Sequence, residues 1–225
     1  MKKTKHTLED QLFGGSLKRT RKTKSKTPKM KWISLSDGTS VIRREKSKPI
    51  SETQAKQRMR WTMSTRFAIT IKEALNFSSC YLKNMTSINY AVKNIFSDCF
   101  TGDYPDYKLN YSNILISKGR VKPLLYPRLK ISARGRGKLD WLIEKGESGA
   151  YGVLQPGDEL CVLLYNESKD TTFFLPDIKM PKVPEIVFKQ PYANKKDKLH
   201  CWVYGIHRYP TVSSDSLYVE IVYED

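Results

Sequence analysis

The hydrophobic periodicity of the chain changes near residue 101, and this change constrains the fold more than any other feature. Across residues 51–97, apolar side chains recur at intervals of three and four, which is the spacing of one face of an α-helix. Beyond the segment 101–106, they alternate in short runs separated by Gly, Pro, Asn, Asp and Ser, as in strands joined by turns. The sequence therefore predicts an α+β protein whose helices precede a β-rich region.

Two helices are expected before the change of period. Ser51 and Gln54 have the spacing of a capping box, in which each side chain bonds the other residue's backbone N–H. The first helix is predicted over roughly 51–80, with an apolar row at Ala55, Met59, Met63, Phe67, Ile71, Ala74 and Leu75. A second helix fits 84–97, with Asn84 or Thr86 as its cap. Two such helices are expected to pack as an antiparallel pair.

The β region is predicted to form an antiparallel all-β sandwich, Ig-like or related. In the run 160–165, Leu-Cys-Val-Leu-Leu-Tyr, both faces are apolar, which indicates a central strand. The β region is expected to start with the apolar pairs Leu109/Tyr111 and Ile114/Ile116, and the further candidate strands are 128–133, 138–143, 159–166, 171–175, 185–189, 199–206 and 216–223.

The start of the chain is predicted to contain a hairpin preceded by a disordered arm. Two short β-prone runs, 30–35 and 40–44, flank a Ser-Asp-Gly turn. Residues 1–30 have too few apolar side chains to offset the entropy of ordering them. We expect a basic arm over 1–30, a hairpin plus helical pair over 31–100, and the sandwich over 101–225.

The positive charge is concentrated in the first quarter of the chain. The protein has a net charge of +17, and residues 1–60 hold 18 Lys+Arg against 5 Asp+Glu, whereas residues 61–225 hold 22 against 18. Such asymmetry indicates an anionic partner, most commonly nucleic acid, because a phosphate backbone releases counterions when basic side chains contact it. An anionic membrane would favour an amphipathic helix, and the run Lys18–Lys26 has no apolar face. A solvated tail without a partner is the alternative.

Basic residues interleaved with aromatic and flexible ones across 17–66 form the pattern that stands out from the rest. Trp32 and Trp61 could stack on bases, at about 1–3 kcal/mol each, but large aromatics are mostly buried, so we favour a core position for both. No groove-reading helix motif is evident, so binding is expected to follow phosphate and shape rather than base sequence. The candidate nucleic-acid-binding residues are Lys18, Arg19, Arg21, Lys22, Lys24, Lys26, Lys29, Lys31, Arg43, Arg44, Lys46, Lys48, Arg58 and Arg60.

No metal site or cofactor is expected. The four cysteines, Cys80, Cys99, Cys161 and Cys201, are scattered without a Cys-x-x-Cys pair and are interpreted as buried small hydrophobes. His200 and Cys201 could be considered as ligands together with His207, but neighbouring residues of a strand point to opposite faces.

Catalytic activity is not expected either. The chain lacks Gly-x-Ser-x-Gly, a P-loop and the dinucleotide glycine fingerprint. Gly135-Arg136-Gly137 is interpreted as a hairpin turn rather than a phosphate cradle, and Asp103 and Asp106 as turn residues rather than a catalytic pair. With only three histidines, no nucleophile–base–orienter set can be assembled, so the protein is predicted not to be an enzyme.

The location is expected to be cytoplasmic. The longest apolar run is far shorter than the ~20 residues that a membrane-spanning helix needs. The basic start of the chain is followed by no apolar segment of the kind found in signal peptides.

Several segments together resemble a domain-of-unknown-function family that is common in Bacteroidota. The resemblance spans nearly the whole chain, and its most specific parts are the helix start and the Tyr-Pro-Asp segment. It brings no known activity, so function has to be argued from the residues. The segments are Phe13-Gly14-Gly15-Ser16-Leu17-Lys18, Trp32, Ile42-Arg43-Arg44, Ser51-Glu52-Thr53-Gln54-Ala55-Lys56-Gln57-Arg58, Asn89-Tyr90-Ala91-Val92, Tyr104-Pro105-Asp106-Tyr107-Lys108-Leu109-Asn110-Tyr111-Ser112, Ile114-Leu115-Ile116-Ser117-Lys118-Gly119, Tyr204-Gly205 and Ser214-Asp215-Ser216-Leu217-Tyr218.

Two functional hypotheses follow. The first is a non-enzymatic structural protein that binds nucleic acid or another polyanion through its basic N-terminal region, without sequence specificity. The alternative is a structural component of a larger protein assembly, such as a phage-like particle, in which the arm threads between subunits and the sandwich docks a partner. A membrane-surface role would require binding that depends on anionic lipid.

Overall fold

A computed structural model describes residues 30–34, 40–44, 49–78, 85–132, 134–142, 152–192, 194–207 and 212–224, with backbone alone for the first two ranges. The chain divides into two compact units, Met1–Pro49 and Ile50–Asp225. The sequence-based division at residue 100 groups the helices with the hairpin, whereas in the structure they share a unit with the sheets. The predicted arm and the residues of the hairpin turn lie outside the described residues.

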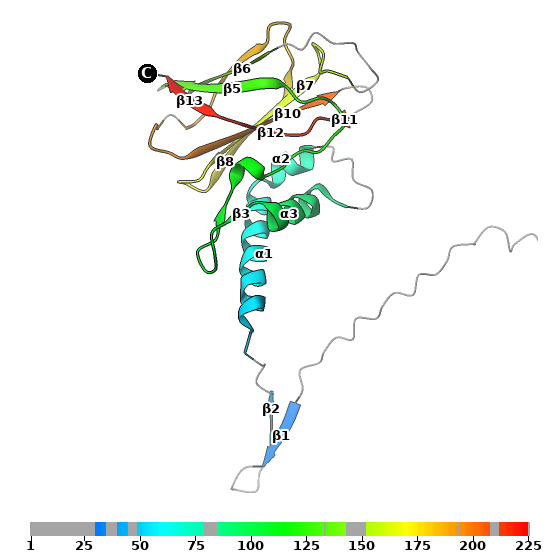
Figure 1. Ribbon diagram of the computed structural model, residues 1–225, viewed down its shortest axis with the longest axis vertical. Coiled ribbons are helices and arrows are strands. Elements are labelled where there is room, and N and C mark those ends of the chain that lie inside the picture. Colours follow the sequence, from blue (N-terminus) through cyan, green and yellow to red (C-terminus); the bar gives the residue numbers. More distant parts are fainter. Residues whose placement is uncertain are drawn as a thin grey trace, which may run out of the picture. The chain divides into compact units, whose positions relative to one another are not determined.

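The described part of the first unit is a two-stranded antiparallel hairpin (Figure 1). It consists of β1 (Met30–Ser34) and β2 (Ser40–Arg44). This confirms the predicted hairpin.

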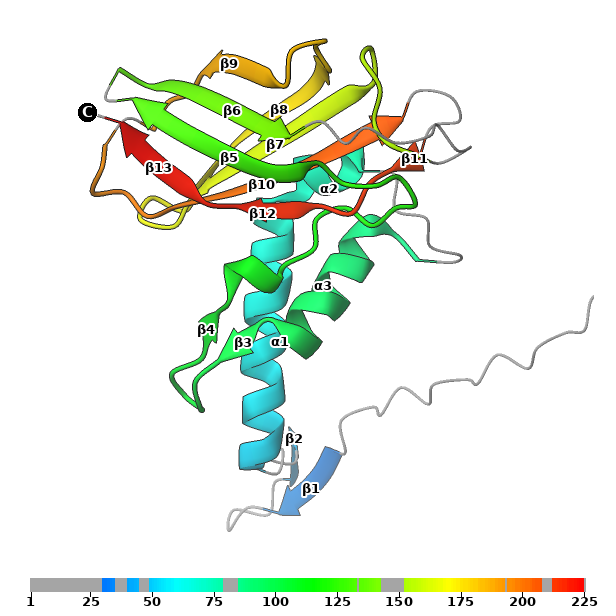
Figure 2. The ribbon, with the colours of Figure 1, turned by 45° about the horizontal axis from the view of Figure 1, so that its top comes forward.

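The second unit begins with three helices. Helix α1 (Glu52–Thr70) starts with the predicted capping box, in which the Ser51 hydroxyl accepts from the Gln54 N–H and the Gln54 Oε1 accepts from the Ser51 N–H, both at 3.3 Å. The expected single helix over 51–80 is interrupted at Ile71, where φ is −97° and ψ is 14°, and α2 (Lys72–Phe77) follows. Helix α3 (Ser87–Asp98) is capped by Thr86 and runs back along α1 as the predicted antiparallel partner (Figure 2).

Two sheets follow, which we call the inner and the outer sheet. The inner sheet has the order β11-β10-β7-β8, with β12 also paired to β10, and the outer sheet has the order β13-β5-β6-β9. The inner strands are β7 (Glu159–Asn166), β8 (Thr171–Lys179), β10 (Leu199–His207), β11 (Val212–Ser213) and β12 (Leu217–Val219). The outer strands are β5 (Leu125–Ser132), β6 (Arg136–Leu142), β9 (Glu185–Lys189) and β13 (Ile221–Glu224).

The sequence predicted a wholly antiparallel sandwich, but one pair of strands in the structure is parallel. The predicted strand 216–223 breaks at Glu220, so that β12 pairs with β10 in the inner sheet and β13 pairs with β5 in the outer sheet. Since no turn separates β12 from β13, the chain keeps its direction as it changes sheet, and β13 runs parallel to β5.

The start of the predicted β region, at Leu109/Tyr111 and Ile114/Ile116, is also different. A short ribbon of β3 (Phe100–Thr101) and β4 (Lys108–Leu109) is followed by a 3₁₀ turn, η2 (Tyr111–Asn113), and then by an irregular segment. The segment is buried without a ladder because side chains take its backbone donors: Asn94 Oδ1 accepts from Leu115 N and Ser216 Oγ from Ile116 N, each at 2.9 Å.

Strand β7 is central, as its two apolar faces predicted. Cys161, Leu163 and Tyr165 belong to a core shared with the helices. Leu160, Val162 and Leu164 belong to a second core shared with the outer sheet. The unit is therefore an α+β structure of three layers, with helices on one side of the inner sheet and the outer sheet on the other (Figures 1 and 2).

We predict that Leu163→Ala lowers the free energy of unfolding by ~2–5 kcal/mol, because it leaves a cavity between the inner sheet and the helices. Val187→Thr on the outer sheet, where Val187 is 54% exposed, should change it by no more than about 0.5 kcal/mol. Urea denaturation followed by tryptophan fluorescence measures both values. Equal losses in the two variants would contradict the assigned core.

Candidate functional site

The hairpin places three of the candidate nucleic-acid-binding residues, Lys31, Arg43 and Arg44, on two paired strands. Lys31 lies opposite Arg43, and Met30 lies opposite Arg44. Like charges directly opposite each other in an antiparallel pair are destabilising by themselves. Trp32 pairs with Ile42 in the same register. The candidates Lys18, Arg19, Arg21, Lys22, Lys24, Lys26, Lys29, Lys46 and Lys48 lie outside the described residues.

Arg58 and Arg60 leave α1 in different directions and have different surroundings. The Arg60 guanidinium donates to the carbonyl oxygen of Phe96 and lies 5.0 Å from the ring centroids of both Phe96 and Phe100, and 5.9 Å from that of Tyr107. These hydrogen-bond and cation–π contacts join α1 to α3 and β3. Arg58 is exposed, so of the two it is the residue whose charge faces solvent.

Trp61 is not part of the core, so the expectation of a buried position was wrong for this residue. It is 57% exposed, and its ring meets Phe96 edge-on at a centroid distance of 6.1 Å. The N-terminal half of α1 extends beyond the sheets, where the end of α3 and the ribbon of β3 and β4 reach it (Figure 2). Trp61 therefore shares an exposed surface with Arg58, Gln57 and Thr62, which together with Phe96 line a shallow hollow. We call this the α1 surface.

A cluster of aromatic rings surrounds His200 where β10 meets η2. The His200 ring stacks on Tyr111 at a centroid distance of 3.9 Å, with Nδ1 2.9 Å from the Tyr218 hydroxyl and Nε2 3.3 Å from a Glu167 carboxylate oxygen. Burial lowers the pKa of His200 below 6.5, although Glu167 acts in the opposite direction. The neutral ring is thus part of the packing between η2 and the inner sheet.

A polar contact next to this cluster ties the turn between β7 and β8 to α1. Asp170 accepts from Arg66 at 2.7 Å and from the Tyr165 hydroxyl at 3.0 Å. These hydrogen bonds lower the pKa of Asp170, while burial raises the pKa of Tyr165. Both shifts favour the forms that make these hydrogen bonds, the ionised Asp170 carboxylate and the protonated Tyr165 hydroxyl. The contact therefore helps to hold the turn against α1.

The residues considered for catalysis or metal binding are dispersed. His200 and Cys201 lie on opposite faces of β10, and Cys201 is buried between the sheets. Asp103 and Asp106 form a turn in which the Asp106 N–H donates to the Asp103 carbonyl at 2.7 Å, as expected. Within the described ranges, no three His, Cys, Asp or Glu side chains come together as metal ligands.

Sequence reasoning missed one basic cluster. Arg134, Arg136 and Lys189 come together at one end of the outer sheet, where β6 pairs with β9. A hairpin was predicted at Gly135-Arg136-Gly137, and β5 and β6 do form one, but the turn ends at Gly135, and Arg136 and Gly137 are the first residues of β6. In the sequence, Arg134 and Arg136 flank a turn glycine, which indicated two basic residues at this position. It did not indicate that Lys189 of β9 lies opposite Arg136.

The chain matches the model of one protein family over residues 33–195, and that family is described as a family of unknown function (DUF6266). This confirms the resemblance to a domain-of-unknown-function family. No curated protein is similar enough to the chain to count as a relative. In the part of the chain that the structure describes, no helix is both long and apolar enough to cross a membrane.

We predict that Arg60→Ala lowers the free energy of unfolding by about 1–3 kcal/mol, because it removes the cation–π contacts and leaves the Phe96 carbonyl without its donor. Arg58→Ala is the matched control, two residues earlier in α1. It should change the free energy of unfolding by no more than about 0.5 kcal/mol. Urea denaturation midpoints of the two variants provide the comparison. If Arg58→Ala proved the more costly change, our assignment of Arg60 as structural would be wrong.

We also predict a pH dependence that originates from His200. Because its pKa is lower in the folded protein than the ordinary 6.5, the unfolded chain binds more protons over the interval between the two values. The free energy of unfolding should therefore fall as the pH drops from about 7.5 through 6.5. Urea denaturation at pH 7.5, 6.5 and 5.5 should show this fall for the wild type and a smaller one for His200→Gln. Parallel profiles for the two proteins would rule out His200 as the source.

Proposed function

Since the chain belongs to the DUF6266 family, whose function is unknown, we propose from its own residues that it is a non-enzymatic structural protein that binds nucleic acid or another polyanion. Binding would occur through the basic N-terminal unit and without sequence specificity. One observation carries the proposal: the division of charge coincides with the division into units. Met1–Pro49 holds 15 Lys+Arg and 4 Asp+Glu, whereas Ile50–Asp225 holds 25 and 19.

The structure of the first unit supports a role in contact rather than in scaffolding. Its described part is a hairpin with strands of five residues, and a two-stranded hairpin alone is marginally stable in water. The excess of positive charge adds self-repulsion. A polyanion would relieve both problems, because its phosphates lie against the basic side chains and release their counterions.

The second unit has a different electrostatic character. Some of its basic residues are in ion pairs, such as Lys56 with Glu52 at 2.8 Å and Lys118 with Asp215 at 3.1 Å. No such balance is possible in the first unit, where acidic residues are outnumbered almost four to one. Since phosphate contacts position a protein without reading base sequence, the binding is proposed to be sequence-blind.

A second candidate function is a structural component of a protein assembly, and the α1 surface favours it. Tryptophan is enriched at protein–protein interfaces. Trp61 is exposed and lies beside Phe96. In that case α1 would meet another protein subunit, and the basic arm would thread between neighbours.

We predict that the wild-type protein binds a 20-base-pair duplex and a single-stranded RNA of the same length, with log K falling linearly against log salt. If about six phosphates are engaged, the slope for the duplex is near −5. A variant with Gln in place of Lys18, Arg19, Arg21, Lys22, Lys24, Lys26 and Lys29 should bind more weakly and with a flatter slope. Fluorescence anisotropy between 50 and 200 mM salt measures both quantities.

The matched control removes seven exposed lysines from the second unit: Lys72, Lys93, Lys108, Lys179, Lys182, Lys196 and Lys198. It loses the same net charge and should retain most of the affinity and slope. Binding that is absent, or independent of salt, would refute the proposal. Light scattering on the same proteins distinguishes the second candidate, since loss of assembly with unchanged nucleic-acid binding would favour it.

A further inference from the structure

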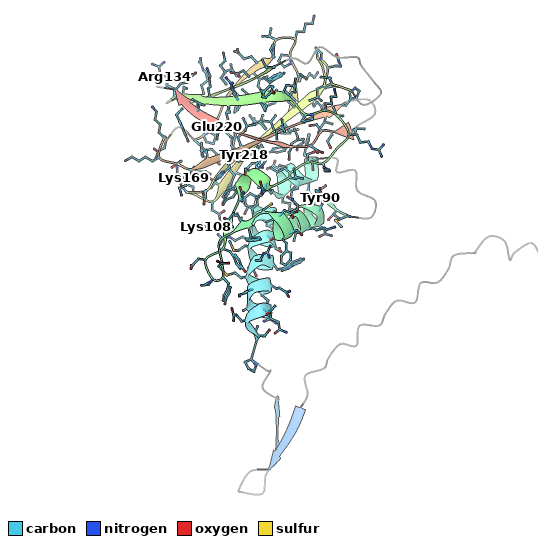
Figure 3. All side chains as sticks on the ribbon, viewed as in Figure 1. Tyr90, Lys108, Arg134, Lys169, Tyr218 and Glu220 are labelled. Carbon is cyan, nitrogen blue, oxygen red and sulfur yellow. The ribbon has the colours of Figure 1, made fainter. Side chains whose placement is uncertain are left out.

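The outer sheet carries a group of basic side chains in the folded second unit, outside the N-terminal region. Arg134 lies in the turn between β5 and β6, Arg136 is the first residue of β6, and Lys189 is the last residue of β9. All three are exposed, and Figure 3 shows Arg134 at the periphery of the sheet. We call them the outer-sheet basic cluster.

The register of the two strands sets like charges against each other. Strands β6 and β9 are antiparallel, and Arg136 lies directly opposite Lys189. Such a cross-strand pair is destabilising relative to a neutral or opposite-charge pair. An anion between the two side chains would reverse the sign of this interaction.

The neighbouring cations Lys130 and Lys138 also lie opposite each other, across β5 and β6, but each of them has a carboxylate partner. Lys138 pairs with Glu185 at 2.7 Å, and Lys130 pairs with Glu224 at 3.4 Å. In contrast, no carboxylate of a described residue lies within ion-pair distance, 4.0 Å, of Arg134, Arg136 or Lys189. Arg128, a further cation of the sheet, lies opposite Asp140, so the opposed cations without a carboxylate partner are at this end.

The cluster borders a hollow, and hydrogen bonds hold the backbone of the turn beside it. The Gly135 N–H donates to the Ser132 carbonyl at 3.0 Å, and the Gly135 carbonyl accepts from the Gln190 N–H at 2.8 Å, so the turn is tied to the end of β9. Gly135 has a φ of +74°, which L side chains rarely adopt. The hollow is lined by Ser132, Arg134, Gly135, Arg136, Val187, Phe188, Lys189 and Glu224.

We propose that the outer-sheet basic cluster is a second phosphate-binding surface, which contacts the backbone of the same nucleic acid as the N-terminal unit. This inference rests on the proposed function and adds a contact in the folded unit. Arginine forks suit phosphate oxygens because they donate in parallel pairs. Glu224 is the one carboxylate among the lining residues, and its charge is already engaged by Lys130. Carboxylates of an acidic protein are the competing ligand.

The test is a triple variant of the full chain, Arg134→Gln with Arg136→Gln and Lys189→Gln. If each side chain neutralises one phosphate, the slope of log K against log salt for the 20-base-pair duplex becomes less steep by about 2.7, from 0.9 per phosphate. The control variant, Lys118→Gln with Lys138→Gln and Lys169→Gln, loses the same net charge from residues that are all ion-paired. It should leave the slope unchanged.

The outcomes separate this inference from the function on which it rests. A wild-type protein that binds, with a triple variant of unchanged slope, overturns the cluster and leaves the proposed function standing. Equal flattening by the triple and control variants also overturns it, because the effect would then reflect net charge alone. A wild-type protein that binds no nucleic acid refutes both. Stronger competition by polyglutamate than by duplex DNA at the cluster would show that its ligand is an acidic protein.

A measurement on the free protein provides a second readout that does not depend on nucleic acid. At low salt, Arg136→Gln should leave the thermal midpoint unchanged or raise it, because it removes the repulsion across β6 and β9. Adding duplex DNA should then raise the midpoint of the wild type more than that of Arg136→Gln. A lower midpoint for Arg136→Gln without DNA would show that Arg136 has a structural role instead, and would overturn the proposal.

Discussion

The burial of β7 and β10 on both faces is the constraint on which the rest of the second unit depends. Leu163 faces the helices and Leu164 faces the outer sheet, so two cores share one pair of strands. Polar groups in this region are satisfied across the layers: Trp202 Nε1 donates to the Ile114 carbonyl at 3.1 Å, and the Tyr204 hydroxyl donates to the Ala74 carbonyl at 3.0 Å. These bonds tie α2 and the irregular segment after η2 to the inner sheet.

This arrangement assigns different roles to basic residues that look alike in the sequence. Arg60 is used to join α1, α3 and β3, and Arg66 is used to hold the turn between β7 and β8. Arg136 faces another cation instead. A basic side chain with a structural partner has little capacity left for a ligand, whereas opposed cations gain from one. In the second unit, location and partners, rather than the number of charges, therefore select the residues proposed to bind.

The two proposed binding regions also differ in how they would be organised. The cluster at the end of β6 and β9 is set by strand register and by hydrogen bonds of the Gly135 backbone, so the backbone that carries its cations is fixed. The N-terminal unit combines a short hairpin with a high density of charge. A polyanion that contacted both would be held by sequence-blind phosphate contacts throughout.

The sequence by itself determined the local elements, because these depend on neighbours along the chain. The capping box at Ser51, the hairpin of 30–44 and the two-faced strand around Leu163 were all predicted from spacing and periodicity. The concentration of positive charge in the first quarter was equally plain. Only the tertiary structure decided which side chains meet across long separations. It placed Trp61 at the surface because α1 extends beyond the sheets, broke the last predicted strand at Glu220 between two sheets, and brought Lys189 to Arg136. Those outcomes depend on the order and register of strands, and local periodicity carries no information about either.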